Sequence, residues 1–246
     1  MEYYLSTVLK HSLIAEDVWI LKLASEGESV RPGQFYMLKA WNDELTLQRP
    51  ISVYKRNANS LEFMYRVVGK GTEKLSRLKR GDSVELLGPL GNGFPVETLQ
   101  GNIALVGGGI GVPPMYETAK YLKKKKQHVD CYFGYKEEPF GFEDFDKVAD
   151  DIYITTESGV EGVEGLITKL LNVALYDAVL CCGPEPMMFA ILKLCREKNI
   201  PCWLSMEKHM ACGIGACLVC NCETHTGMKR ACKDGPVFNG TELIIK

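Results

Sequence analysis

The first hundred residues alternate between apolar and polar positions in short runs, and turn-forming residues separate the runs. Alternation with a period of two is typical of strands that bury one face, whereas Gly, Asn and Asp between the runs favour turns. We interpret four runs as strands: Val18–Leu23, Gly33–Lys39, Leu61–Val68 and Ser83–Leu87. Several short strands at this spacing predict an antiparallel barrel or sandwich.

From about residue 101 the pattern changes to continuous apolar, β-branched runs with helix-like stretches between them. The clearest helix is Glu185–Arg196, which has a basic residue in its last turn. Apolar runs that alternate with helices predict a parallel sheet with crossover helices, and therefore an α/β domain. The runs are Ile103–Val106, Val129–Phe133, Ile152–Thr155, Ala178–Cys182 and Cys202–Leu204.

The chain beyond residue 205 follows neither pattern, because it is rich in Cys and Gly and has little hydrophobic periodicity. A segment this short buries too little apolar surface to fold alone, so we expect a covalent or metal staple. The sequence thus predicts three parts: an antiparallel β-barrel domain over 1–99, a parallel-sheet α/β domain over 100–205 and a small C-terminal segment over 206–246.

Composition narrows the possible partners. The formal net charge of −2 gives no indication of nucleic acid or an anionic membrane surface as the main partner, so we expect neither. No run approaches the ~18 apolar residues of a membrane span, and the N-terminus lacks the pattern of a secretory signal. We therefore expect a cytoplasmic protein. Half of its ten cysteines fall between Cys212 and Cys232, and in a reducing compartment such density points to metal before disulfides.

Four of these cysteines have the spacing of an iron–sulfur site. Cys212, Cys217 and Cys220 form a C-x4-C-x2-C motif, and Cys232 follows after eleven intervening residues. This is the plant-type [2Fe–2S] spacing, and glycines in the motif permit a tight loop around a cluster. We predict these four as metal ligands.

Two alternatives to the cluster remain open, a structural zinc site and no metal at all. A structural zinc site prefers two C-x2-C pairs, and only Cys217 and Cys220 have that spacing. His209 and His225 lie nearby, and Cys222 is a spare thiol to which the sequence assigns no role.

A glycine-rich turn opens the α/β domain. The apolar run over 102–106 leads into Gly-Gly-Gly-Ile-Gly-Val-Pro-Pro, and a helical stretch follows from Met115. A strand, a glycine turn and a helix form a pyrophosphate cradle, although such turns also occur without a ligand. The order GGGIG differs from G-x-G-x-x-G, so we expect a family other than the Rossmann dehydrogenases. The expected nucleotide contacts are Gly107, Gly108, Gly109, Ile110, Gly111 and Pro113.

A second turn, Cys182-Gly183-Pro184, ends another predicted strand. Ligands of open α/β sheets bind beyond the carboxyl ends of strands, so we expect both turns to face one crevice. The alternative is a plain strand-to-helix turn. Glu137 and Glu138 follow the second strand, and acidic residues there favour NAD(H) over NADP(H).

Five motifs in this order carry a family resemblance. Arg49-Pro50-Ile51-Ser52, which we place between two strands, is joined by the YRVVGKGT motif over 65–72, GPLGNGF, GGGIGVPPM and CGPEPM. Together they resemble the ferredoxin–NADP reductase superfamily over nearly the whole chain. The resemblance implies a flavin-binding antiparallel barrel followed by a nicotinamide-binding α/β domain. It implies FAD contacts at Arg49, Pro50, Ile51, Ser52, Tyr65, Arg66, Val67, Gly71 and Thr72, with Arg49 on the pyrophosphate and Ser52 near the isoalloxazine.

The tail narrows the resemblance. MACGIGACLVC followed by ACKDGPVF is similar to the electron-transfer subunits of the type-B dihydroorotate dehydrogenases. Related ferredoxin:NADP oxidoreductase and sulfide dehydrogenase subunits have Asp where this chain has Cys212, which favours the dihydroorotate family. The resemblance implies an NAD-dependent oxidoreductase subunit of pyrimidine biosynthesis. FAD and a [2Fe–2S] cluster would pass electrons between NAD(H) and the FMN of a separate catalytic subunit, in a heterotetramer. We assign no catalytic residue for dihydroorotate.

Two other functions remain open. The first is a reductase subunit of a ferredoxin:NAD(P) oxidoreductase, a sulfide dehydrogenase or a hydrogenase complex. The second is a non-catalytic redox or zinc sensor that binds a nucleotide without turnover.

Overall fold

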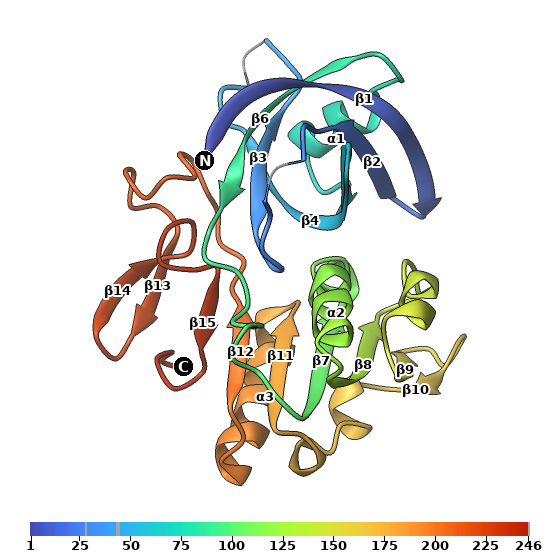
Figure 1. Cartoon of the computed structure of the whole chain (residues 1–246), viewed down its shortest axis with the longest axis vertical. Coiled ribbons are helices and arrows are strands. Elements are labelled where there is room, and N and C mark those ends of the chain that lie inside the picture. The colour runs from blue at the N-terminus through green and yellow to red at the C-terminus, as the bar shows by residue number, and fades with distance from the viewer. Residues whose placement is uncertain (28, 43–44, 246) are drawn as a thin grey trace.

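Six antiparallel strands close a barrel in the first ninety residues of the computed structural model, which describes residues 1–27, 29–42 and 45–245 (Figure 1). Their order around the barrel is β1-β2-β5-β4-β3-β6. A short helix, α1 (Lys70–Ser76), lies between β5 and β6. The strands are β1 (Glu2–Ala15), β2 (Val18–Ala24), β3 (Phe35–Lys39), β4 (Arg49–Asn57), β5 (Ser60–Arg66) and β6 (Ser83–Leu90).

Alternation explains which barrel strands the sequence predicts. In β6, Val84 and Leu86 point into the barrel core and Glu85 between them faces outward. The four predicted strands are confirmed, whereas β1 was missed because both of its faces carry apolar residues. Val8 is buried in the barrel and Leu5 on the other face is exposed, and an irregularity after Val8 shifts the alternation along the rest of the strand. The placement of Arg49–Ser52 between strands was wrong, because these residues begin β4.

The second domain is a seven-stranded sheet with the order β10-β9-β8-β7-β11-β12-β15. All neighbours are parallel except β12 and β15. The five predicted runs are confirmed as β7, β8, β9, β11 and β12, and the fold class is confirmed with them. The strands are β7 (Asn102–Gly108), β8 (His128–Tyr135), β9 (Asp151–Thr156), β10 (Val163–Glu164), β11 (Ala178–Cys182), β12 (Cys202–Ser205) and β15 (Val237–Asn239).

Helices cover opposite faces of this sheet. α2 (Met115–Lys124) packs its apolar side on Ile103 and Leu105, whereas α3 (Glu185–Lys198) packs on Ala104 and Val106. Both helices begin where the sequence predicts. Four 3-10 helices complete the domain: η1 (Gly109–Gly111), η2 (Glu143–Lys147), η3 (Ile167–Lys169) and η4 (Val173–Leu175).

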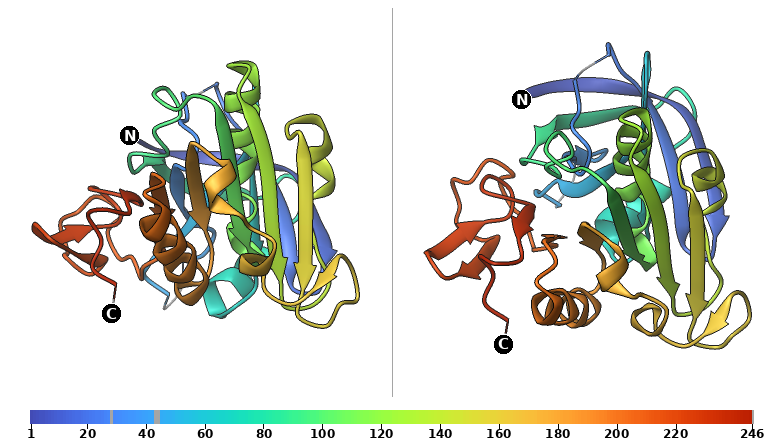
Figure 2. Two further views of the ribbon diagram at one scale, coloured as in Figure 1. Left: turned by 90° about the horizontal axis from the view of Figure 1, so that it is seen from below. Right: turned by 60° about the horizontal axis from the view of Figure 1, so that its bottom comes forward.

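The cysteine-rich tail packs beside the edge of the sheet (Figures 1 and 2). It forms the hairpin β13 (Asn221–Thr224) and β14 (Gly227–Arg230), and then contributes β15 to the sheet. One hydrophobic cluster joins Met37 of the barrel, Val179 of the sheet and Ala231 of the tail. The boundaries at 99/100 and 205/206 stay predictions, and residues 28, 43, 44 and 246 lie outside the described residues. Among the described helices, none is long and apolar enough to cross a membrane.

Candidate functional site

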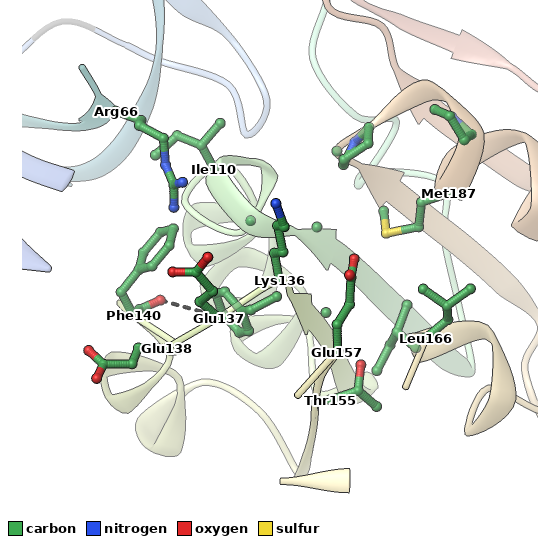
Figure 3. Close-up of a pocket in the computed structure, with 18 of the residues that line it drawn as sticks. Arg66, Ile110, Lys136, Glu137, Glu138, Phe140, Thr155, Glu157, Leu166 and Met187 are labelled. Atoms are coloured by element: carbon green, nitrogen blue, oxygen red, sulfur yellow. Dashed lines mark hydrogen bonds between the residues drawn. The ribbon is translucent and has the colours of Figure 1, made fainter. Parts of the chain in front are cut away.

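A cavity of about 920 Å³ opens between the barrel and the carboxyl ends of the parallel strands (Figure 3). This is the volume range of cofactor sites. Arg66 enters it from the barrel, while Lys136 and Glu157 reach it from the sheet side (Figure 3). Four neighbouring strands contribute a residue at or near their carboxyl ends: Gly108 of β7, Gly134 of β8, Thr155 of β9 and, directly after β11, Gly183.

Two glycine turns meet at the floor of this cavity. A Cβ on Gly111 would lie 2.3 Å from the carbonyl oxygen of Cys182, and one on Gly183 would lie 2.9 Å from Cα of Gly108. Only residues without a side chain permit this approach, so the two turns share one crevice as expected. Gly108, Gly109, Ile110, Gly183 and Pro184 line the cavity. Gly107, Gly111, Pro113 and Cys182 are buried outside its lining.

The cavity wall is acidic. Glu137 and Glu138 line it as the sequence suggests, with Glu16, Asp17 and Glu157 around them. Glu207 follows β12 by two residues and also faces the cavity, although it belongs to none of the sequence motifs. The surface of Glu207 is open to the cavity, but the protein around it raises the pKa of this carboxyl by desolvation. Its place just beyond the end of a parallel strand is the signal that points to it.

On the barrel, three of the expected FAD contacts come together at the start of β4 and α1. The Arg49 guanidinium lies 5.5 Å from the centre of the Trp41 ring and donates to the carbonyl oxygen of Leu47 at 2.6 Å. A Cβ on Gly71 would lie 2.3 Å from Nε of Arg49. The Thr72 hydroxyl accepts the backbone N–H of Val68 at 3.0 Å, which orders the turn into α1.

The other expected FAD contacts divide between two faces of the barrel wall. Ile51 is partly buried and packs against the barrel core, so its strand neighbours Pro50 and Ser52 face outward. Arg66 is exposed and is the one member of the set that lines the cavity. Val67 follows β5, and its N–H donates to the carbonyl oxygen of Asp17 at 2.8 Å.

Tyr65 faces the barrel interior rather than a ligand. Its side chain is buried, burial raises its pKa, and its hydroxyl lies 3.0 Å from Nε2 of His11. His11 Nδ1 donates to the carbonyl oxygen of Leu78 at 2.9 Å, so a neutral imidazole accepts the Tyr65 proton at Nε2. The backbone of Tyr65, not its ring, is therefore the part that can face a flavin.

The four predicted cysteines lie as two pairs. Sγ of Cys220 and Sγ of Cys232 are 3.2 Å apart, and the N–H of Cys217 donates to Sγ of Cys212 at 3.4 Å. Within the described ranges, no three or more His, Cys, Asp or Glu side chains converge on one point as they would around a single ion. Two separate thiol pairs instead suit a two-iron cluster with four cysteine ligands. The donor set therefore fits a [2Fe–2S] cluster.

Loop geometry supports this fit. Gly213 and Gly215 have φ of +70° and +82°, and the backbone curls around Cys212. Burial opposes ionisation of this thiol, but N–H groups of Cys217, Ile214 and Ala216 lower its pKa to about 6. These amides stabilise the thiolate that a metal needs.

Cys222, the spare thiol, points into the hydrophobic core from β13. Burial raises its pKa to about 11, so it remains a neutral, packed side chain. Arg230 in β14 connects two parts of the cysteine-rich tail. It donates to the carbonyl oxygen of Gly215 at 3.2 Å and pairs with Asp234 at 2.9 Å.

An antiparallel barrel joined to a parallel α/β domain, with a cavity at their junction, defines the ferredoxin reductase class of fold. The ferredoxin reductase of carbazole 1,9a-dioxygenase shares it with a TM-score of 0.69 at 20% identity, over 81% of this chain and 66% of that chain. The NADH-dependent reduced ferredoxin-NADP oxidoreductase matches with a TM-score of 0.88 at 30% identity, over 98% of this chain and 90% of that chain.

Sequence comparison narrows the class further. Residues 207–244 match the family model of the iron-sulfur cluster binding domain of dihydroorotate dehydrogenase B. The dihydroorotate dehydrogenase B (NAD(+)) electron transfer subunit of Clostridium acetobutylicum is 48% identical, covering 99% of this chain and 98% of that protein. The corresponding subunit of Clostridium perfringens is 44% identical over the same shares. The chain belongs to the family of dihydroorotate dehydrogenase B electron transfer subunits.

Proposed function

We propose that this chain carries electrons between NAD(H) and the catalytic subunit of a dihydroorotate dehydrogenase in pyrimidine biosynthesis. The observation that carries the proposal is the placement of two sites around one barrel face. The nucleotide cavity adjoins Arg66 on β5. The cysteine loop, residues 212–220, contacts Met37 on β3, because a Cβ on Gly213 would lie 2.8 Å from Cγ of Met37. Strand β4, which carries the flavin motif, lies between β3 and β5.

FAD bound on this face would exchange electron pairs with NAD(H) and single electrons with a [2Fe–2S] cluster. Arg49 and the first turn of α1 would hold the diphosphate, since a guanidinium and backbone N–H groups suit that charge. Ser52 would face the isoalloxazine from β4. The proposed FAD residues are Arg49, Pro50, Ile51, Ser52, Tyr65, Arg66, Val67, Gly71 and Thr72.

The proposed NAD(H) residues form the two glycine turns, where backbone N–H groups would meet the pyrophosphate. The acidic wall would disfavour a ribose 2′-phosphate and so favour NAD(H) over NADP(H). These residues are Gly107, Gly108, Gly109, Ile110, Gly111, Pro113, Cys182, Gly183 and Pro184. The proposed cluster ligands are Cys212, Cys217, Cys220 and Cys232.

The catalytic partner would dock over the cysteine loop. Cys217 is exposed, and three apolar side chains of the same loop are exposed with it: Ile214, Leu218 and Val219 at 45%, 59% and 55%. Exposed apolar groups around a redox centre suit a protein interface that excludes water. We propose the FMN-bearing subunit as the occupant, in a heterotetramer. None of the ten cysteines is paired in a disulfide, which supports work in the reducing cytoplasm.

The test is the visible spectrum and iron content of the anaerobically purified chain, with NADH and NADPH added separately. We expect flavin bands overlaid by sulfur-to-iron absorption, bleached faster by NADH than by NADPH. A colourless protein that carries zinc would refute the proposal.

A second candidate is a ferredoxin:NAD(P) oxidoreductase subunit, favoured by the 30% identity to the NADH-dependent reduced ferredoxin-NADP oxidoreductase. Reconstitution separates the two candidates. Dihydroorotate should reduce the complex with a dihydroorotate dehydrogenase catalytic subunit if the first is right, whereas reduction by ferredoxin alone would support the second.

A further inference from the structure

A charged cluster joins the two domains at the second half of β4. Tyr54 donates its hydroxyl to Oδ2 of Asp144 in η2, and Nζ of Lys55 pairs with the same carboxylate oxygen. Lys55 Nζ also lies 4.7 Å from the ring centre of Tyr54 and 4.9 Å from that of Tyr116 in α2. One lysine thus contacts a carboxylate and two aromatic faces. The lysine and its three partners come from three elements: β4, η2 and α2.

The next residue along β4 is held through its backbone. The N–H of Arg56 donates to Oε1 of Glu117 at 2.9 Å, and Nζ of Lys120 donates to the carbonyl oxygen of Arg56 at 3.2 Å. Glu117 and Lys120 pair with each other at 2.9 Å on α2. Both backbone polar groups of one residue are therefore bound across the domain boundary, which fixes the strand in two directions.

We name these groups the β4 clamp: Tyr54, Lys55 and Arg56 on the barrel, with Tyr116, Glu117, Lys120 and Asp144 on the α/β domain. Beneath the clamp, the buried Tyr54 packs in a cluster that also contains Phe145 and Met115. The side chain of Lys55 is 18% exposed, so its pairing with Asp144 is partly shielded from water.

The clamp connects the two proposed cofactor sites through short paths. β4 begins with Arg49 and Ser52 of the flavin motif, and the clamp starts only two residues beyond Ser52. α2 begins just after the glycine turn of the nucleotide cavity and carries the clamp in its first two turns. One strand and one helix therefore connect the clamp to both sites.

We propose that the β4 clamp is a positioning device, which sets the distance and angle between the flavin and the nicotinamide. This inference rests on the proposed function. None of its side chains lines the nucleotide cavity, and none belongs to the proposed FAD or NAD(H) residues, so we place the action of the clamp in β4 and α2. Electron-pair transfer needs close contact between the reacting rings, and a misplacement of about 1 Å costs up to ~100-fold in rate.

The experiment compares Lys55→Met, Asp144→Ala and the double variant with the wild type, each carrying FAD and cluster. Stopped-flow mixing with NADH gives the limiting rate of flavin bleaching and, from its concentration dependence, the Kd for NADH. We expect each single variant to lower the limiting rate at least about tenfold while the Kd stays within about twofold, because the nucleotide turns lie wholly in the α/β domain. The limiting rate of the double variant should be no lower than that of either single variant, because each substitution breaks the same Lys55–Asp144 contact.

Two further variants separate positioning from general damage. Lys55→Arg keeps the charge and should restore most of the rate. Lys123→Met removes a charge from the same helix that pairs within the α/β domain, with Asp150 at 2.6 Å, and should match the wild type.

Unchanged bleaching rates in Lys55→Met and Asp144→Ala would overturn the clamp proposal. So would an equal loss in Lys123→Met, or a loss confined to NADH affinity or FAD content. Failure of the proposed function looks different, because the wild type itself would then not be bleached by NADH, or would not be reduced by dihydroorotate in complex with a dihydroorotate dehydrogenase catalytic subunit.

Discussion

Gly71 and Arg49 are in direct contact across the gap between α1 and β4, and a Cβ on Gly71 would lie 2.3 Å from Nε of Arg49. The guanidinium thus occupies the space that any other residue at 71 would fill. Arg49 is the group proposed to hold the FAD diphosphate, so the glycine sets where that positive charge lies.

Gly71→Ala should release FAD without unfolding the barrel. The new methyl group meets the flexible end of an arginine, which can swing aside, and Ala is favoured over Gly in a helix. We expect the dissociation constant for FAD to rise roughly tenfold and the melting temperature to stay constant, as measured by flavin fluorescence and calorimetry. Arg49→Ala should lose at least as much affinity. Gly69→Ala is the control, since a Cβ there meets nothing within 4 Å, and equal losses in both glycine variants would contradict the explanation.

Cys217→Ala should remove the cluster and leave the flavin bound, because the cysteine loop and the flavin motif lie on different elements. Iron and sulfide content and the visible spectrum measure both. Cys222→Ala should keep the cluster and destabilise the fold by about 1 kcal/mol, as small losses from a core do. An intact cluster in Cys217→Ala would refute its role as a ligand.

Arg230→Met should make the cluster labile. Arg230 bridges Gly215 in the first half of the loop and Asp234 beyond Cys232, so its loss frees the two halves from each other. Residues around a metal site that orient its ligands typically contribute a factor of 10 to 100 in affinity. We expect iron release to a chelator to accelerate about tenfold. Lys229→Met, which removes the neighbouring lysine paired with Glu242, should release iron at the wild-type rate.

The stability that Asp144 contributes should disappear in acid. Burial opposes its ionisation, but hydrogen bonds from Lys55 and Tyr54 outweigh this and lower its pKa. A carboxyl whose pKa is lower in the folded state stabilises the protein above its unfolded pKa and loses that effect as the pH falls through the folded value.

Asp144→Asn should therefore lower the urea midpoint at pH 7 and differ less and less from the wild type below about pH 4. The effect is small, about 0.5 kcal/mol, because the carboxylate is 45% exposed. Asp146→Asn on the exposed side of η2 is the matched control. A difference between Asp144→Asn and the wild type that is constant from pH 7 to pH 3 would contradict this explanation.

Local patterns in the sequence were enough for much of the fold and for the chemistry of the site. The spacing from Cys212 to Cys232 predicted a cluster, and the turn at Gly107–Gly111 predicted a nucleotide cradle. Each of these motifs lies in a short segment, so the residues that form it are close together in the sequence. The runs from Ile103 to Leu204 predicted the parallel sheet for the same reason. Strand β1 was not predicted, because its exposed leucines interrupt the alternation of apolar and polar residues that is typical of a barrel strand.

What only the tertiary structure decided lies between segments far apart in the chain. It turned the Tyr65 ring into the barrel toward His11, brought Glu207 to the cavity, placed Arg49 over Gly71 and joined β4 to η2 through Asp144. It also made β15 an edge strand of the α/β-domain sheet. Periodicity reports which face of an element is buried, but the partner on that face is chosen by packing and charge complementarity once the elements assemble.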